Sequence, residues 1–246
     1  MEDTPMERGT IQASTFKSTE LNEELELITY LPPSYSPLYK HHIVIIQDGR
    51  DYFNLGRLAT TADKLYDEQA ISNAIFVGIP YKDKYDRREK YHPNGKKNAA
   101  YIRFLAHEII PFLDEQYPTY QMGYGRFLMG DSLGATVSLN AALMYPNTFG
   151  NVAMHSPFVN DELIEKVKNF PNPYLLKLYH IIGTDELEVE TTNGQVQDFL
   201  TPNRKLNEVI TERGFEYFYE EFDGNHMWRY WQPDIARTLQ YMLVHI

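Results

Sequence analysis

The sequence contains no cysteine, which excludes disulfide bonds, thiolate nucleophiles and zinc sites built on thiolates. It also contains no apolar run close to the ~20 residues that a membrane-spanning helix needs. Basic residues are in the minority, with 23 Lys and Arg against 34 Asp and Glu and a net charge of -11. Because phosphate contacts require clusters of Lys and Arg, we expect neither nucleic acid nor a membrane as a partner.

The first residues, Met1 to Arg8, are polar and acidic, and no apolar segment follows them. A secretory signal requires such a segment, so we expect a cytoplasmic protein. Hydrophobic residues make up 43% of the 246 positions, which is enough for a sizeable core. Because no linker or internal repeat interrupts the chain, we expect a single domain over residues 1–246.

Predicted strands alternate with predicted helices along most of the chain. Two alternating segments, 9–16 and 24–31, predict an antiparallel hairpin at one sheet edge. The other strands are expected at 42–47, 73–79, 126–129, 151–155, 175–182 and 215–222, and several are continuous apolar runs typical of strands buried on both faces. Helices are expected at 58–67, 98–117 (with Pro111 kinking or breaking it), 133–144, 161–168, 203–213 and 228–246.

This order predicts an α/β fold with a mostly parallel central sheet, an antiparallel N-terminal edge hairpin and helices on both faces. Two connecting segments have no predicted element. The segment 81–97 carries many charges of both signs and predicts a solvated loop. The segment 48–51 contains an Asp-Gly pair after a buried strand and predicts a turn.

The pattern Gly130-x-Ser132-x-Gly134 lies between the predicted strand 126–129 and the predicted helix 133–144. This context is typical of a nucleophile elbow, in which a strained backbone exposes a serine hydroxyl. The glycines are expected where a Cβ would collide with the neighbouring strand or helix. We therefore predict that Ser132 is a nucleophile and that the amide of Leu133, at the positive end of the helix, donates to an oxyanion.

A serine nucleophile needs a base, and the base needs an orienting carboxylate. Of the 8 histidines, only His226 follows the last predicted strand and precedes the last predicted helix. That is the place of the base when the chain order is Ser, acid, His. The acid should follow the strand 175–182, where Asp185 and Glu186 are adjacent. We favour Glu186, three residues after Gly183, and keep Asp185 as the alternative.

A second oxyanion donor should come from the turn at 48–51, and we assign it to the amide of Arg50. The sequence has no phosphate-binding loop and no dinucleotide fingerprint, so we expect no cofactor. No cluster of His, Asp and Glu has the spacing of metal ligands, so we expect no metal.

Four motifs together resemble the putative esterase family of α/β-hydrolases, which includes esterase D, ferric enterobactin esterases, bacterial feruloyl esterases and mycolyltransferases. They are residues 46–49 (IQDG), 86–87 with 91–93 (DR and YHP), 130–134 (GDSLG) and 224–228 (GNHMW). Within this family the chain is similar to small uncharacterised cytoplasmic esterases of Firmicutes. The resemblance implies an α/β-hydrolase fold over nearly the whole chain, with Ser132 as nucleophile and His226 as base. It also implies that the segment around Arg87 and Tyr91 is an ordered wall of the substrate site.

The expected reaction is hydrolysis of a small-molecule carboxylic ester through an acyl-enzyme on Ser132. One alternative is a siderophore trilactone esterase, for which Arg50, Arg87 and Arg88 would bind an anionic catecholate ligand. An acyltransferase and a non-catalytic protein on the same fold are two further alternatives. The oligomeric state stays open, and a homodimer is one of the options.

Overall fold

The computed structural model describes residues 6–243, and within this range eight strands form one mixed sheet in the order β1-β2-β4-β3-β5-β6-β7-β10. Every pairing is parallel except those of β1 with β2 and of β2 with β4. The strands are β1 (Thr10–Ser18), β2 (Glu23–Leu31), β3 (His42–Gln47), β4 (Ala74–Ile79), β5 (Arg126–Asp131), β6 (Asn151–His155), β7 (Lys177–Gly183) and β10 (Glu216–Phe222). Two short strands, β8 (Val189–Glu190) and β9 (Val196–Gln197), form a separate hairpin after β7.

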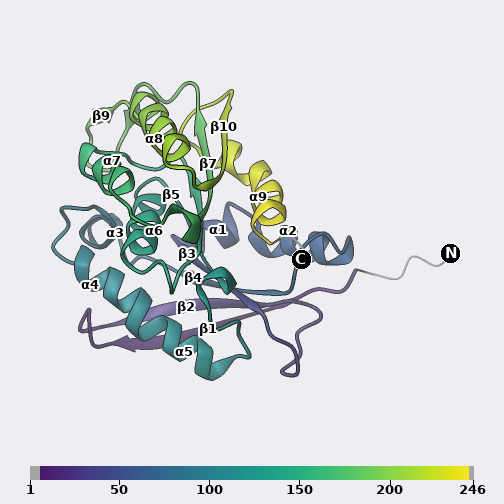
Figure 1. Ribbon diagram of the computed structural model, residues 1–246. Coiled ribbons are helices and arrows are strands. Elements are labelled where there is room, and N and C mark those ends of the chain that lie inside the picture. Colours follow the sequence, from purple (N-terminus) through teal and green to yellow (C-terminus); the bar gives the residue numbers. More distant parts are fainter. Residues whose placement is uncertain (1–5, 244–246) are drawn as a thin grey trace.

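Helices cover both faces of this sheet (Figure 1). They are α1 (Gly49–Asn54), α2 (Leu58–Asp67), α3 (Lys84–Tyr91), α4 (Asn98–Arg103), α5 (Ile110–Gln116), α6 (Leu133–Met144), α7 (Asp161–Lys168), α8 (Leu200–Arg213) and α9 (Trp228–Met242). Core residues of α3 to α8 pack on one face, and those of α1, α2 and α9 pack on the other. Within the described range no helix has the length and apolar character needed to cross a membrane. The predicted fold class is confirmed. The helix predicted at 228–246 is present as α9, and its last three predicted positions, 244–246, lie outside the described residues.

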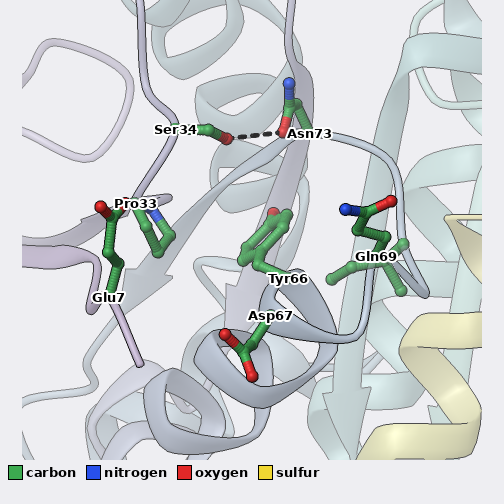
Figure 2. Close-up of a pocket in the computed structure, with 8 residues that line it drawn as sticks. Glu7, Pro33, Ser34, Tyr66, Asp67, Gln69 and Asn73 are labelled. Carbon is green, nitrogen blue, oxygen red and sulfur yellow. Dashed lines mark hydrogen bonds between the residues drawn. The ribbon is translucent and has the colours of Figure 1, made fainter. Parts of the chain in front are cut away.

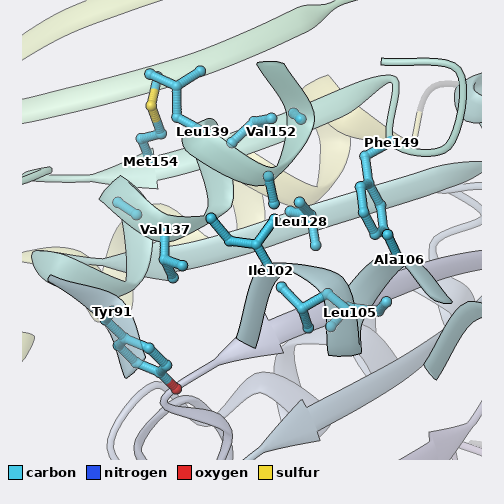
Figure 3. Close-up of a cluster of buried hydrophobic side chains, with 14 of the residues drawn as sticks. Tyr91, Ile102, Leu105, Ala106, Leu128, Val137, Leu139, Phe149, Val152 and Met154 are labelled. Carbon is cyan, nitrogen blue, oxygen red and sulfur yellow. The ribbon is translucent and has the colours of Figure 1, made fainter. Parts of the chain in front are cut away.

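Strand β3 shows how the continuous apolar runs build two cores. Ile43 and Ile45 belong to the cluster on one face, and Val44 and Ile46 belong to the cluster on the other. All four side chains are buried, and full burial of one such side chain contributes about 1.5–3 kcal/mol. Figure 3 shows part of the first cluster, where Leu128 of β5 lies among side chains from the covering helices. A strand covered on both faces has no polar alternation, which explains the pattern of its sequence.

The predicted N-terminal hairpin is present as β1 and β2, with Ser14 opposite Leu27 in the register. In β2, Leu25 and Leu27 face the core, and both are buried. Strand β1 lies at the edge of the sheet and is exposed along most of its length. Its weak alternation follows from this position, because neither of its faces is fully covered.

The segment 81–97, predicted as a solvated loop, instead contains helix α3. Asp83 caps this helix, and its carboxylate accepts hydrogen bonds from two amides of the first turn. The sequence pattern concealed the helix because its inward face carries Arg87 and Tyr91 rather than aliphatic side chains. The segment 48–51 likewise differs from the prediction, since it leads directly into α1 instead of forming an isolated turn.

The helix predicted at 98–117 is continuous but changes its type. A π-helical turn over Phe104–Ile109 separates α4 from α5, and Pro111 lies in the first turn of α5. The amide of Ile110 bonds to the carbonyl of Leu105, five residues back. Because Pro111 has no N–H to continue the usual pattern, the break expected at this residue takes the form of a wider turn.

His180 of β7 is buried and held in its neutral form. Its Nε2 bonds to Oδ1 of Asn203 at 2.7 Å, and its Nδ1 bonds to the hydroxyl of Tyr217 at 2.8 Å. The side-chain amide nitrogen of Asn203 donates to the carbonyls of residues 157 and 199, so its oxygen is the acceptor for His180. Burial lowers the pKa of His180 from 6.5 to about 4.

The free energy of unfolding should therefore decrease when the pH is lowered from 7 to 5. Between the folded pKa of about 4 and the unfolded value of 6.5, the folded state binds fewer protons, so stability is lost as the pH falls through this window. We expect His180 to account for about 2 kcal/mol of the loss at pH 5. Urea denaturation at both pH values measures it. The pH dependence should be smaller in His180→Gln, and an unchanged dependence would contradict this role.

Candidate active site

Ser132 lies between β5 and α6, at the carboxyl end of the parallel strands. Its φ of 52° and ψ of -123° are rarely adopted by a residue other than glycine. The neighbouring glycines permit this turn. A Cβ on Gly130 would lie 2.4 Å from the backbone of Gly134, and a Cβ on Gly134 would lie 2.9 Å from Oδ2 of Asp48. The strand–turn–helix geometry that the sequence predicts is present, and it turns Ser132 into a cleft.

The imidazole of His226 is held by Glu186. Nδ1 of His226 lies 2.7 Å from Oε2 of Glu186, and the Glu186 side chain is fully buried. The ring also packs between Phe199 and Trp231, with centroid distances of 4.6 and 4.8 Å. When Nδ1 donates to the carboxylate, Nε2 is free to accept a proton. His226 lines the same cleft as Ser132, so the structure brings serine, histidine and carboxylate together.

Asp185, the alternative acid, has an exposed side chain. Its backbone amide donates to the carbonyl of Gly224 at 2.9 Å, and thereby ties the loop after β7 to the loop that carries His226. Gly183 allows this close approach, because a Cβ there would lie 2.3 Å from the same carbonyl oxygen. The loop so fixed turns Glu186 inward and leaves Asp185 outside, and this makes Glu186 the partner of His226.

The second carboxylate oxygen of Glu186 is also bound. It accepts hydrogen bonds from the hydroxyl of Ser156 at 2.6 Å and from the amide of Gly183 at 2.9 Å. The Ser156 hydroxyl in turn accepts a hydrogen bond from the indole N–H of Trp231 at 3.0 Å. The sequence reasoning missed Ser156, although it directly follows β6 just as Ser132 directly follows β5.

Arg87 of α3 connects the ends of β3 and β5. Its Nε and Nη2 donate to the carboxylate of Asp48 at 2.8 and 2.6 Å, and Nη2 also lies 3.3 Å from the carbonyl of Asp131. Burial alone would lower the pKa of Arg87, but the charge of Asp48 and the hydrogen bonds to it outweigh burial and raise this pKa. Burial, followed by the charge of Asp48, raises the pKa of Asp131 well above its ordinary value. Arg87 lines the cleft, yet its guanidinium is engaged by its own chain.

Two residues of the predicted site have other surroundings than expected. Tyr91 is buried in the core, where its hydroxyl accepts a hydrogen bond from the amide of Asp48 at 3.3 Å, a placement that does not fit a residue in contact with substrate. The side chain of Arg50 pairs with Glu26 of β2. The amides of Arg50 and Leu133 lie in the first turns of α1 and α6, where amides lack intrahelical acceptors. Their part in an oxyanion hole stays a prediction.

The cleft beside Ser132 contains about 510 Å³ of space between atoms, part of which is open to solvent. One part of its lining, the α3 wall, is Arg88 of α3 and the following His92; the lining also includes Leu133, Phe158 and the hairpin of β8 and β9. The sequence predicted no element in this hairpin, because strands of two residues are too short to show alternation.

A second hollow, with about 1200 Å³ of space between atoms that includes open solvent, lies at the opposite end of the parallel strands, where β4 begins (Figure 2). In it the hydroxyl of Ser34 donates to Oδ1 of Asn73 at 3.0 Å. None of its lining residues is a histidine, so no base is at hand to activate Ser34. Across residues 6–243, no three His, Asp or Glu side chains are grouped as metal ligands would be. The cleft at Ser132 is therefore the candidate active site.

This fold and this site define a class of protein. A mostly parallel sheet, a serine on a strained turn between strand and helix, and an acid–histidine pair in the chain order Ser, acid, His are together the features of an α/β-hydrolase. Within that class, the chain belongs to the putative esterase family, whose profile matches residues 18–242.

Known proteins similar to this chain include esterases. The uncharacterised protein YjcH of Bacillus subtilis strain 168 is 52% identical over 235 residues, which cover 96% of this chain and 98% of YjcH. An acetyl esterase of Caldicellulosiruptor saccharolyticus is 25% identical over 178 residues, which cover 62% of this chain and 67% of that enzyme. The structure of the enterobactin esterase FES from Shigella flexneri in the presence of enterobactin matches with a TM-score of 0.80 at 18% identity, over 98% of this chain and 63% of FES. At that identity the likeness to FES supports the fold alone.

Arg87→Gln should strongly destabilise the protein. It would leave the buried carboxylate of Asp48 without its counter-charge, which costs about 3–5 kcal/mol. Arg204→Gln is the matched control, because Arg204 makes the same two-pronged contact with Glu221 at 2.9 and 2.7 Å on the exposed surface, where an ion pair contributes little. Urea denaturation of both variants at pH 7 makes the comparison. If the two variants lost the same free energy of unfolding, the buried pair of Arg87 and Asp48 would contribute no more to stability than the exposed pair of Arg204 and Glu221.

Proposed function

We propose that the chain is a serine carboxylesterase. The observation that carries this proposal is the 2.7 Å contact between Nδ1 of His226 and the buried carboxylate of Glu186, in a cleft that Ser132 also lines. Oγ of Ser132 attacks the ester carbonyl while Nε2 of His226 takes the proton. Glu186 orients the imidazole and stabilises the imidazolium that forms.

Two backbone amides, those of Leu133 and Arg50, stabilise the oxyanion of the tetrahedral intermediate. Support for the second comes from the close approach of Gly134 to Asp48, because Asp48 immediately precedes α1 and so brings the first amides of α1 toward the elbow. The intermediate collapses to an acyl-enzyme, and His226 gives its proton to the leaving alcohol. Water then attacks the acyl group with His226 as base, which releases the acid and restores the serine.

A simple ester fits this cleft better than a catecholate trilactone does. An anionic chelate needs several unengaged cations, and the sequence suggested Arg50, Arg87 and Arg88. The first is paired with Glu26 and the second with Asp48. Arg88 is the one of the three without an ion pair among the described residues, and a single cation suits a substrate of lower charge. Acyl transfer to an alcohol would use the same acyl-enzyme, and product analysis with added alcohol distinguishes it from hydrolysis.

A fluorophosphonate probe should label the folded protein once, at Ser132. The activated hydroxyl attacks phosphorus, fluoride leaves, and a stable phosphonyl-serine remains. Peptide mapping by mass spectrometry locates the adduct, and Ser132→Ala is the control that should stay unlabelled. If the intact, folded protein carried no adduct, Ser132 would not be an activated nucleophile.

Glu186→Gln and Asp185→Asn should separate the two neighbouring acids. With Gln at 186 the imidazole loses the carboxylate that fixes its tautomer, and we expect kcat on 4-nitrophenyl acetate to fall by about 10³- to 10⁴-fold. Asp185→Asn removes an exposed charge and keeps the backbone bond to Gly224, so its kcat should stay within about twofold of the parent. The reverse ranking would assign the acid to Asp185. Circular dichroism confirms that both variants fold.

A further inference from the structure

Arg88 is a half-buried cation that lines the cleft with no partner among residues 6–243. Its neighbour Arg87 uses Nε and Nη2 on the carboxylate of Asp48. No hydrogen bond or ion pair in the described part of the chain engages the guanidinium of Arg88. A guanidinium carries five N–H donors in a planar fork, which matches a carboxylate in geometry as well as charge.

His92, one turn after Arg88, supplies a second donor to the same wall. Nδ1 of His92 accepts a hydrogen bond from the backbone amide of Asn94 at 3.1 Å, so in the neutral ring the proton is on Nε2. Burial, followed by the charge of Arg88, lowers the pKa of His92, which keeps the ring neutral at pH 7. The ring also packs against Phe158 with a centroid distance of 5.3 Å, which restricts its orientation.

We propose that Arg88 and His92 form an anion subsite on the α3 wall of the cleft, and that it receives a carboxylate carried by the ester substrate. This assignment rests on the proposed esterase function of Ser132. The expected substrates are esters of short dicarboxylic acids or of hydroxy acids, in which one free carboxylate lies a few atoms from the scissile ester bond.

The other residues that line the cleft suit a substrate with one negative charge better than a substrate with several. Leu133, Phe158 and Val189 give an apolar lining that suits a short carbon chain between ester and carboxylate. The β8–β9 hairpin adds the carboxylate of Glu190 to the lining, and this carboxylate repels a second negative charge on the substrate. A monoanionic ester places its charge on Arg88 and keeps its neutral part against the apolar lining.

The first test compares esters that differ in one charge. We would measure kcat/KM for 4-nitrophenyl acetate, hemisuccinate and hemiglutarate, and form the ratio of each anionic ester to the neutral one. Arg88→Gln should lower this ratio about tenfold or more, because a charge-assisted hydrogen-bonded pair is lost. Lys84→Gln on the same helix removes the same charge outside the cleft and should leave the ratio unchanged. Arg88→Lys, which keeps the charge without the fork, should lie between.

The second test does not depend on turnover. N-(4-nitrophenyl)succinamic acid and 4-nitroacetanilide are the amide counterparts of the anionic and neutral esters, and their Kd values are measured by calorimetry on the intact protein. The acid should bind more tightly than the neutral amide to the wild type. Arg88→Gln should raise the Kd of the acid about tenfold, and Lys84→Gln should not change it. His92→Phe should weaken the binding of the acid selectively, since it removes the Nε2–H donor and keeps a ring against Phe158.

The two tests separate the subsite from the esterase chemistry. If neutral esters are hydrolysed while Arg88→Gln changes neither the kinetic ratio nor the Kd of the acid, the anion subsite is wrong and the esterase proposal stands. If no ester is hydrolysed while the acid still binds through Arg88, the esterase proposal is wrong and the anion subsite stands. Thermal unfolding of each variant shows that it is folded, and Arg88→Lys replaces Arg88→Gln if the latter is not.

Discussion

The site depends on how three adjacent parallel strands end. Asp48, Ser132 and Ser156 follow β3, β5 and β6, and their φ angles are 55°, 52° and 48°. Each such residue costs about 1–3 kcal/mol unless its surroundings hold it. The amide of Ser132 donates to the carbonyl of His155, that of Ser156 to Ile181, both one strand further along the sheet. The three strained turns lie at the same end of the parallel strands, and they place there the Asp48 carboxylate, the Ser132 hydroxyl and the Ser156 hydroxyl that donates to Glu186.

The buried ion pair of Arg87 and Asp48 matters because it positions α3, and not because it adds much to the free energy of unfolding. A buried pair gains little over apolar packing, because the cost of removing both charges from water is large. Arg87 nevertheless reaches Asp48 after β3 and the carbonyl of Asp131 at the end of β5, so it fixes α3 against the two strand ends that flank the elbow. The α3 wall of the cleft is therefore rigid. The β8–β9 hairpin is hydrogen-bonded within itself, as in the 2.8 Å contact from the amide of Thr191 to the carbonyl of Gln195, and its Val189 belongs to a buried cluster that includes Ile182 of β7.

The sequence was sufficient for the fold class, because apolar runs and helical stripes are local patterns. A glycine-flanked serine is also a local pattern, and it led to the prediction of Ser132, an acid and His226 in that chain order. The sequence favoured Glu186 but kept Asp185, since which carboxylate faces His226 depends on a tertiary contact, the approach of Gly183 to Gly224. Helix α3 was missed for a related reason. Its inward side chains are charged or phenolic and find their partners on distant strands, so no periodicity of aliphatic residues could reveal them.

Ser156 shows what such tertiary information adds. Its hydroxyl donates to Glu186 and accepts from the indole of Trp231, whose ring in turn packs at 4.8 Å against the imidazole of His226. Together with the hydrogen bond from Nδ1 of His226 to Glu186 they form a closed ring of contacts, so the imidazole cannot rotate without breaking a contact to α9 or to the loop after β7. In the proposed mechanism, a base fixed in this way would serve any ester whose carbonyl reaches Ser132. Selection among esters would then come from the lining of the cleft, where no ion pair or hydrogen bond within residues 6–243 engages the guanidinium of Arg88.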